Sequence, residues 1–462
     1  MHVAIIGGGA AGLSIALTLH SRGIACTIYE SKDAPYRGLG ALMLAPNALR
    51  LLDSLGLYQQ LRSRGFNFST VEFRDESDNA HDKWQMGNRD KYGYDALRIT
   101  RPAFLDVLRA AVDERGIKVK YGARYSHVVE ETQKGVTFQL GDGTRVQADI
   151  LVGADGVYSE VRKSIAPTIQ PIYSGTLALI ATIKRRFANT DLNQTTKPPQ
   201  TTFFHSQSNA LLVLPQEHDG SQACLGTQRK YPEQSREDWV HLGYDKDKLY
   251  NLFMQDASKW PARVQDTMSQ IDKNDIYIWP FYALPDLPSW TSLPHRRTIL
   301  VGDAAHSIPP IGGQGACQAI ETAYTLAMVI STMSKIPNAP ADSFAKSIES
   351  WQSARQERVQ KARLFTKQLD NNRLPQAERA KLPAGTYWEA GQHPDLSWLY
   401  GAGLANSEAK GVTRVKVQKS PTGKRGTVTH VRAATVDGTI DTTANLQNLR
   451  RVGTEDIIRG AC

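Results

Sequence analysis

Cysteine is scarce in this chain, and long apolar runs are missing. The four cysteines, Cys26, Cys224, Cys317 and Cys462, are scattered, and none stands in CxxC or CxxH spacing. This distribution excludes a disulfide scaffold and a structural zinc site, and it fits a reducing compartment. Because no run of about 18 apolar residues occurs, the sequence predicts no transmembrane helix.

A targeting signal and a nucleic-acid signature are missing as well. Met1 is followed by the apolar run Val3–Ile6 without a charged segment or a cleavage site, so we expect no secretory signal and a cytoplasmic location. The net charge is +9, but the basic residues are dispersed and no nucleic-acid-binding motif is present, so we expect no nucleic-acid partner. With 41% hydrophobic and 22% charged residues, the chain is neither fibrous nor wholly disordered, and its length suits two or three structural units.

The first thirty residues carry a glycine-rich turn between two predicted strands. The apolar run Val3–Ile6 predicts a short strand, and a GxGxxG pattern follows at residues 7–12. The apolar spacing of Leu13–Leu19 predicts a helix, and Cys26–Tyr29 predicts a second strand that ends at Glu30. This strand, turn, helix and strand order with a terminal acid indicates a dinucleotide-binding unit.

Each glycine of this turn has a physical task. Gly7 permits the tight turn, Gly9 lets the backbone approach a pyrophosphate, and Gly12 allows the helix to pack closely on the sheet. The helix N-terminus offers unpaired N–H groups and a positive dipole end to the phosphates. The Glu30 carboxylate suits a ribose 2′-hydroxyl and disfavours a 2′-phosphate. The turn alone leaves both NAD and FAD open as ligands.

Two later predicted strands end in an aspartate. Residues 147–156 end in Ala-Asp-Gly and residues 300–303 end in Gly-Asp, and the glycine-rich run 312–316 then opens a predicted helix. Such corners place a carboxylate and free N–H groups at one edge of a sheet. The carboxylate suits a hydroxyl of a ribityl chain, and the second helix N-terminus suits the electron-rich N1–C2=O region of a reduced flavin.

The three motifs together resemble the fingerprints of the single-component FAD-dependent aromatic hydroxylases. The GxGxxG pattern at 7–12, Ala-Asp-Gly at 154–156 and Gly-Asp-Ala-Ala-His at 302–306 have the order and separations of that family. The family includes para-hydroxybenzoate, salicylate and 6-hydroxynicotinate hydroxylases and many fungal natural-product monooxygenases. The resemblance implies an α/β fold of the para-hydroxybenzoate-hydroxylase type, in which a discontinuous Rossmann-like FAD-binding domain carries a sheet-based substrate domain.

The motif positions imply a division of the chain. The FAD-binding domain is expected to be assembled from residues 1–75, 96–170 and 285–370. Residues 171–284 are expected to form the substrate-binding domain, with Val71–Phe73 as a further contributor, and residues 371–401 a closing segment. The basic C-terminal extension 402–462 has no counterpart in the family, and both a disordered tail and a small strand-containing appendage stay open for it.

The resemblance also implies site residues. Those expected to hold FAD are Gly7, Gly9, Ala11, Gly12, Glu30, Gly40, Ala41, Arg101, Asp155, Asp303, Gly315 and Ala316. Arg101 would contact the phosphate or sugar region, and Asp303 the ribityl or pyrophosphate part. From the residues alone, two other roles stay open: Arg101 could be a surface arginine of a helix, and Asp303 could be a helix N-cap. His306 is expected to be structural.

The implied chemistry is a metal-free monooxygenation that consumes NADH or NADPH. Reduced flavin would react with O₂ at C4a, and the resulting C4a-hydroperoxyflavin would deliver one oxygen atom to an aromatic or heteroaromatic substrate. We expect a place in secondary metabolism. The alternative is an epoxidase acting on an alkene or indole double bond. The choice between NADH and NADPH, the substrate and the oligomeric state stay open.

The substrate domain offers few polar side chains for catalysis. His205 and Tyr282 are the catalytic candidates, and a structural role stays open for each. Where phenol-hydroxylating relatives carry histidine or tyrosine, this chain has Ala210, Leu214 and Met43. These apolar positions favour a larger, less polar and already electron-rich substrate over a simple hydroxybenzoate.

Overall fold

The computed structural model describes residues 1–35, 39–184, 201–205, 210–337, 340, 342–372, 379–388, 392 and 394–401. Met1–Tyr400 forms one compact unit. The basic extension 402–462 lies outside the described residues, so both interpretations of it stay predictions. Among the described residues, no helix combines the length and apolar character that a membrane crossing needs.

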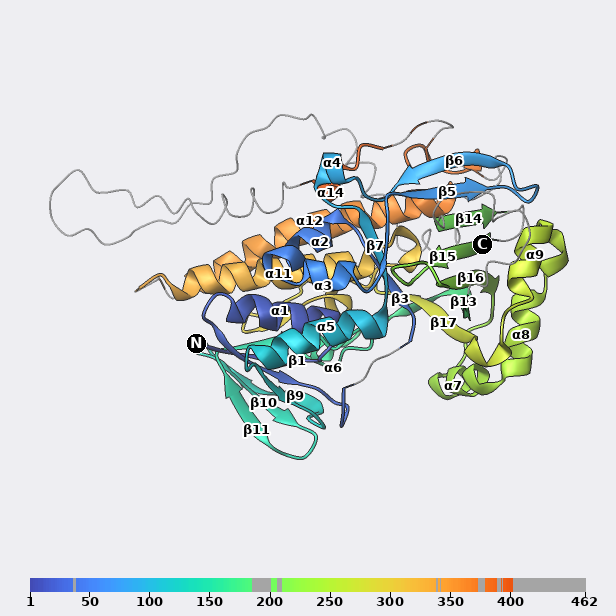
Figure 1. Ribbon diagram of the computed structural model, residues 1–462. Coiled ribbons are helices and arrows are strands. Elements are labelled where there is room, and N and C mark those ends of the chain that lie inside the picture. Colours follow the sequence, from blue (N-terminus) through green and yellow to red (C-terminus); the bar gives the residue numbers. More distant parts are fainter. Residues whose placement is uncertain are drawn as a thin grey trace. The chain divides into compact units, whose positions relative to one another are not determined.

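A five-stranded parallel sheet carries the first motif, and its strand β1 is labelled in Figure 1. In spatial order, its strands are β18 (Thr298–Leu300), β12 (Ile150–Gly153), β1 (His2–Ile6), β2 (Ala25–Tyr29) and β8 (Lys118–Lys120). Ile6 lies opposite Gly153, and Gly153 lies opposite Leu300. The carboxyl ends of β1, β12 and β18 therefore meet at one edge, where all three motifs begin.

Long helices cover this sheet and brace one another. The principal ones are α1 (Ala10–His20), α5 (Arg101–Glu114), α11 (Gly315–Ser334) and α12 (Ser343–Asn371). Helix α1 packs against α11 and α5, and α11 packs against α12. Thr100 Oγ1 caps α5 by accepting the Ala103 N–H at 3.3 Å, and Pro102 follows in the first turn. This cap fixes where α5 begins and so where Arg101 stands.

A seven-stranded sheet forms a second layer. In spatial order, its strands are β17 (Tyr277–Ala283), β13 (Ile172–Lys184), β16 (Gln222–Lys230), β15 (Ala210–Pro215), β14 (Thr201–His205), β5 (Thr70–Arg74) and β6 (Ala80–Gln85). Strand β5 runs parallel to β14. One face is covered by α7 (Arg236–Tyr244), α8 (Lys246–Met254) and α9 (Ala262–Met268), which bury Leu177 and Leu179 in an apolar cluster.

Two smaller sheets and several short helices complete the fold. One three-stranded sheet consists of β3 (Ala41–Leu44), β7 (Ala96–Thr100) and β4 (Phe66–Phe68), and another of β11 (Arg145–Ala148), β10 (Val136–Leu140) and β9 (Tyr125–Glu131). The short helices are α2 (Pro46–Ser54), α3 (Tyr58–Arg62), α4 (Arg89–Tyr92), α6 (Glu160–Lys163), α10 (Asp303–His306) and α14 (Ser397–Tyr400), with 3₁₀ turns at Ala257–Lys259, Lys273–Asp275 and Pro310–Gly312. The α/β fold predicted from the sequence is confirmed. The domain limits stay predictions.

Candidate cofactor and substrate site

Three turns that are remote in sequence meet at the carboxyl edge of the parallel sheet. An ideal Cβ on Gly7 would lie 2.5 Å from Ala154 O, so the first turn touches the Ala-Asp-Gly turn. An ideal Cβ on Gly302 would lie 2.9 Å from the Cβ of Ala11, so the Gly-Asp turn touches α1. The structure therefore brings the three motifs together.

The first turn is packed on one side and open on the other. An ideal Cβ on Gly12 would lie 1.9 Å from Gly7 O, and Gly7 has a φ of +104°, so both positions exclude other side chains. Around Gly9, by contrast, no described atom lies within 4 Å of an ideal Cβ. Gly9 is the exposed N-cap of α1 and provides no side-chain cap. The first N–H groups of this 11-residue helix thus border open space, which fits a pyrophosphate.

Glu30 is held beside this turn at the end of β2. Its Oε2 accepts the Gly8 N–H at 2.8 Å, and its Oε1 accepts the Lys32 N–H at 2.9 Å. A carboxylate has about four acceptor positions, so Glu30 keeps capacity for a ribose hydroxyl.

Asp155 joins the second turn to the helix that follows it. Its Oδ2 accepts two N–H groups from the first turn of α6, and its Oδ1 accepts the Ser159 hydroxyl at 2.5 Å. Burial raises the pKa of Asp155, and these hydrogen bonds oppose the rise. Arg162 of α6 then donates from Nη1 to Ala304 O at 3.2 Å, which ties the second turn to the third. The proposed contact of Asp155 with FAD stays a prediction.

Asp303 has the surroundings of a group inside a cleft. Its side chain is exposed to water, yet burial within the surrounding protein raises its pKa, and the nearby Arg101 opposes this rise. The helix cap left open by the sequence is not what the structure has: Gly302 is the N-cap of α10, and Asp303 is the first residue of that helix. The carboxylate is therefore accessible to a ligand.

Gly40, Ala41 and Arg101 are neighbours. Gly40 O accepts the Arg101 N–H at 2.8 Å, and Ala41 pairs with Thr100 across β3 and β7. The Arg101 guanidinium lies over the Trp279 ring, 5.2 Å from its centroid. These contacts bring the loop before β3 and the start of α5 against β17 of the larger sheet.

Gly315 and Ala316 open α11 next to β3. Both are partly exposed, and the first turn of this 20-residue helix contains no acidic residue. An ideal Cβ on Gly313 would lie 1.8 Å from Met43 Cε, so the preceding loop packs directly on β3. The positive end of a long helix beside β3 fits the carbonyl edge of a flavin.

The second face of the seven-stranded sheet is largely apolar. The side chains alternate along β13, so Ile180 faces away from the covering helices, and its partners across the sheet are Gly226 and Tyr277. Leu212 pairs with Gly226 on β15. The Tyr277 hydroxyl would lie 3.5 Å from an ideal Cβ on Gly40. The apolar face thus reaches the residues expected at the flavin, and it is the candidate substrate surface.

The two candidate catalytic residues have different surroundings. Tyr282 accepts the Trp239 Nε1–H at 3.1 Å, and its carbonyl accepts the hydroxyl of Ser307, which follows the third motif. His205 stands at the end of β14 with its Nε2 2.8 Å from Nε2 of His81. The structure therefore brings Tyr282 toward the motifs and places His205 with His81. Both catalytic roles stay predictions.

Sequence reasoning missed a buried ionic network behind α11. Glu321 and Arg355 are both 0% exposed and lie 2.8 Å apart, and Arg358 contacts the same carboxylate at 2.7 Å. Burial alone would raise the pKa of Glu321, but the two guanidinium groups lower it to about 2. Asn47 donates to Glu321 at 2.6 Å and to Gln314 at 3.2 Å. The network therefore reaches the loop that precedes α11. The sequence signal that could have indicated this network is Glu321, the one acidic residue in an otherwise largely apolar predicted helix.

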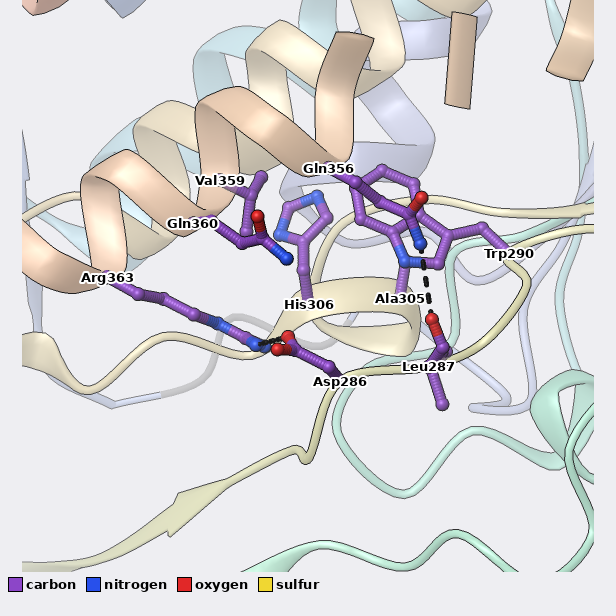
Figure 2. A pocket seen from close by; sticks show the side chains of 9 residues that line it. All are labelled: Asp286, Leu287, Trp290, Ala305, His306, Gln356, Val359, Gln360 and Arg363. Carbon is purple, nitrogen blue, oxygen red and sulfur yellow. Dashed lines mark hydrogen bonds and ion pairs between the residues drawn. The ribbon is translucent and has the colours of Figure 1, made fainter. Parts of the chain in front are cut away.

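His306 lines a small cavity behind the third turn (Figure 2). The cavity holds about 100 Å³ and is lined by Asp286, Leu287, Trp290, Ala305, His306, Gln356, Val359, Gln360 and Arg363. His306 is 1% exposed, and its Nε2 lies 2.8 Å from Thr322 Oγ1. Burial lowers the pKa of His306 to about 3, so the ring is neutral near pH 7. These surroundings support a structural role. Asp303 does not line this cavity.

Metal ligation finds no support in the described residues, because they contain no cluster of three or more histidine, cysteine, aspartate or glutamate side chains able to hold an ion.

Known sequences and structures match this arrangement. Residues 1–340 match the family described as FAD binding domain. The 3-amino-4-hydroxybenzoate 2-monooxygenase PtnB3 of Streptomyces platensis is 27% identical over 408 residues, which cover 86% of this chain and 95% of the relative. The FAD-dependent monooxygenase pynG of Aspergillus niger is 29% identical over 364 residues, which cover 72% of this chain and 80% of the relative.

Solved structures share the fold. HpxO of Klebsiella pneumoniae, complexed with FAD and uric acid, has a TM-score of 0.68 at 22% identity, and the match covers 82% of this chain and 91% of HpxO. CtdE in complex with FAD and a substrate has a TM-score of 0.71 at 21% identity, and the match covers 89% of this chain and 98% of CtdE. This chain therefore belongs to the FAD binding domain family and is an FAD-dependent monooxygenase of the aromatic-hydroxylase type.

Proposed function

We propose that this enzyme oxidises NADH or NADPH and inserts one oxygen atom of O₂ into an aromatic or heteroaromatic substrate. The observation that carries the proposal is the meeting of the turns at 7–12, 154–156 and 302–306 at one sheet edge, beside an apolar sheet face. The balanced reaction converts NAD(P)H, H⁺, O₂ and the substrate into NAD(P)⁺, the oxygenated product and water. A single GxGxxG pattern is present, so the nicotinamide nucleotide binds transiently, without a dinucleotide domain of its own.

The residues present fit FAD. The open side of the first turn suits the pyrophosphate, Glu30 the adenosine ribose, and Asp303 the ribityl or pyrophosphate part. Arg101 suits the phosphate or sugar region, and the N-terminus of α11 suits the isoalloxazine edge. The chemistry that bound FAD supplies is acceptance of a hydride and activation of O₂.

The protein itself has to hold the substrate ring and keep water away. The apolar face around Ile180 and Leu212 serves both purposes, because it presents hydrocarbon to the ring and offers water few partners. The resemblance to PtnB3 and to fungal monooxygenases such as pynG supports an aromatic substrate and a place in secondary metabolism.

The experiment combines flavin loading, substrate screening and isotope labelling. The purified protein is reconstituted with FAD and screened with aromatic and heteroaromatic compounds, beginning with 3-amino-4-hydroxybenzoate, for those that accelerate NADH or NADPH oxidation. We expect a yellow protein and a product that carries one atom from isotopically labelled O₂. A colourless protein or an unlabelled product would contradict the proposal. An oxirane product would support the epoxidase that the sequence leaves open.

A further inference from the structure

Arg98 brings a positive charge to the border between the expected flavin position and the apolar face. It stands in the middle of β7, opposite Met43 of β3 and Phe66 of β4. Its side chain reaches toward the seven-stranded sheet, where its charge lowers the pKa of the thiol of Cys224 on β16. Its charge also acts on Tyr277 of β17, whose hydroxyl neighbours Gly40. The guanidinium therefore lies where the two layers face each other.

The two titratable side chains on which Arg98 acts, Cys224 and Tyr277, are neutral near pH 7. Cys224 is 3% exposed, and burial raises the pKa of its thiol more than Arg98 lowers it. Burial likewise raises the pKa of Tyr277. Within the described part of the chain, none of the ion pairs includes Arg98, and its Nε is buried without a hydrogen-bond partner. A guanidinium keeps its charge in proteins, so this charge is left without an anionic partner there.

A second arginine serves the cofactor side. The charge of Arg101 lowers the pKa of Asp303, and the charge of Arg98 lowers the pKa of Cys224. Both charges lower the pKa of Tyr277. This arrangement assigns Arg101 to the FAD residues and Arg98 to the substrate face. Arg98 as a whole is partly buried. A charge without an anionic partner is costly where it is withdrawn from water, and a bound anion would compensate it through short, bidentate hydrogen bonds.

We propose that Arg98 is a substrate-binding residue that pairs with an anionic oxygen, a carboxylate or a phenolate, of the aromatic substrate. This role rests on the proposed function and narrows its substrate class to compounds with an acidic group. The apolar face then holds the ring, while Arg98 fixes its orientation.

The test compares Arg98→Met and Arg98→Lys holoenzymes with the wild type. Binding of three probes is followed through the flavin absorption spectrum: 3-amino-4-hydroxybenzoate, its methyl ester and 3-aminobenzoate. We expect Arg98→Met to raise the Kd of 3-amino-4-hydroxybenzoate about tenfold to a hundredfold, the usual effect of losing a charged hydrogen bond. Arg98→Lys should raise this Kd less. If the methyl ester binds equally to both proteins, the anchor is the carboxylate. If 3-aminobenzoate does so instead, the anchor is the phenolate.

Controls separate binding from structure. Arg64→Met removes the same charge at an exposed position and should bind every probe as the wild type does. FAD content should be unchanged in Arg98→Met, and its apo form should unfold at the wild-type temperature or above it, because an uncompensated charge has been removed.

Three results would overturn the role of Arg98. The first is wild-type binding of 3-amino-4-hydroxybenzoate that is no tighter than binding of its methyl ester or of 3-aminobenzoate. The second is equal Kd values in wild type and Arg98→Met, and the third is a loss of FAD or of stability in that variant. Failure of the proposed function is recognised separately, by the absence of labelled oxygen in any product.

Discussion

At the scale of single residues, Asp303 combines exposure to water with enclosure by protein. Replacing Asp303 with alanine removes an accessible carboxylate at the cleft without disturbing the Gly302 cap. We expect Asp303→Ala to lower FAD affinity by about 1.5–3 kcal/mol, which corresponds to roughly tenfold to a hundredfold in Kd. Flavin retained on ultrafiltration and fluorescence titration of the apoprotein measure this change.

A matched carboxylate provides the control for this variant. Asp286 pairs with Arg363 beside the cavity lined by His306 and has a side chain that is 68% exposed. Asp286→Ala should keep full FAD content. Full flavin loading of Asp303→Ala would contradict the role assigned to Asp303.

His306 makes stability depend on pH in a defined window. Its pKa falls from 6.5 to about 3 on folding because the ring is buried. Between these values the unfolded chain binds a proton that the folded chain does not, so this residue makes stability fall as the pH falls from 6.5 toward 3. His306→Gln should remove up to about 1.4 kcal/mol per pH unit from that slope. Urea unfolding between pH 7 and pH 4 measures it, and equal slopes in both proteins would show that the histidine does not titrate as described.

At the scale of elements, the first turn separates a structural glycine from a binding glycine. A Cβ on Gly12 would collide with Gly7 O, whereas a Cβ on Gly9 would enter open space. Gly12→Ala should therefore unfold at a clearly lower temperature or fail to fold. Gly9→Ala should keep the wild-type unfolding temperature as apoprotein and bind FAD more weakly, because a methyl group now blocks the approach of the pyrophosphate. Thermal unfolding with and without FAD distinguishes these outcomes. Equal behaviour of the two variants would contradict the assignment.

The Glu321 network joins α11 to α12. Glu321→Gln leaves Arg355 and Arg358 in buried surroundings without their carboxylate. We expect a loss of about 3–5 kcal/mol in the free energy of unfolding, the usual result of breaking a buried pair. The control is Glu349→Gln, whose 61% exposed side chain pairs with Arg296 and should cost at most about 1 kcal/mol. Urea unfolding at pH 7 compares both, and a loss no larger than that of the control would show that the network contributes little.

The sequence predicted elements best where the signal is local. The helix predicted from the apolar spacing of Leu13–Leu19 lies within α1, and the strand predicted at Cys26–Tyr29 is β2, which starts one residue earlier. The meeting of the three glycine corners was also predictable, because parallel strands in one sheet end at one edge. Strand β6 and the position of Arg98 were not, since both depend on contacts between residues far apart in the sequence. The sequence around Arg98 does not show which of the two sheets the side chain of a polar residue in the middle of a strand faces.

At the scale of the whole molecule, one ligand is expected to touch segments from three parts of the chain. FAD should therefore stabilise the folded state as a unit. At a free concentration of about one hundred times its Kd, it should add about 2.7 kcal/mol and raise the unfolding temperature by a few degrees in a concentration-dependent way. Differential scanning calorimetry across an FAD titration measures this shift. A temperature independent of FAD concentration would contradict selective binding to the folded state.

The order of the strands has a consequence for biosynthesis. Strand β1 pairs with β12, β12 pairs with β18, and α11 begins only at Gly315. At about 5–20 residues per second, a ribosome needs roughly 15 to 60 seconds after making the first corner to complete the last. The nascent chain must keep its apolar strands from aggregating throughout that interval. The vitamin-derived cofactor can be captured only once translation has passed the third corner.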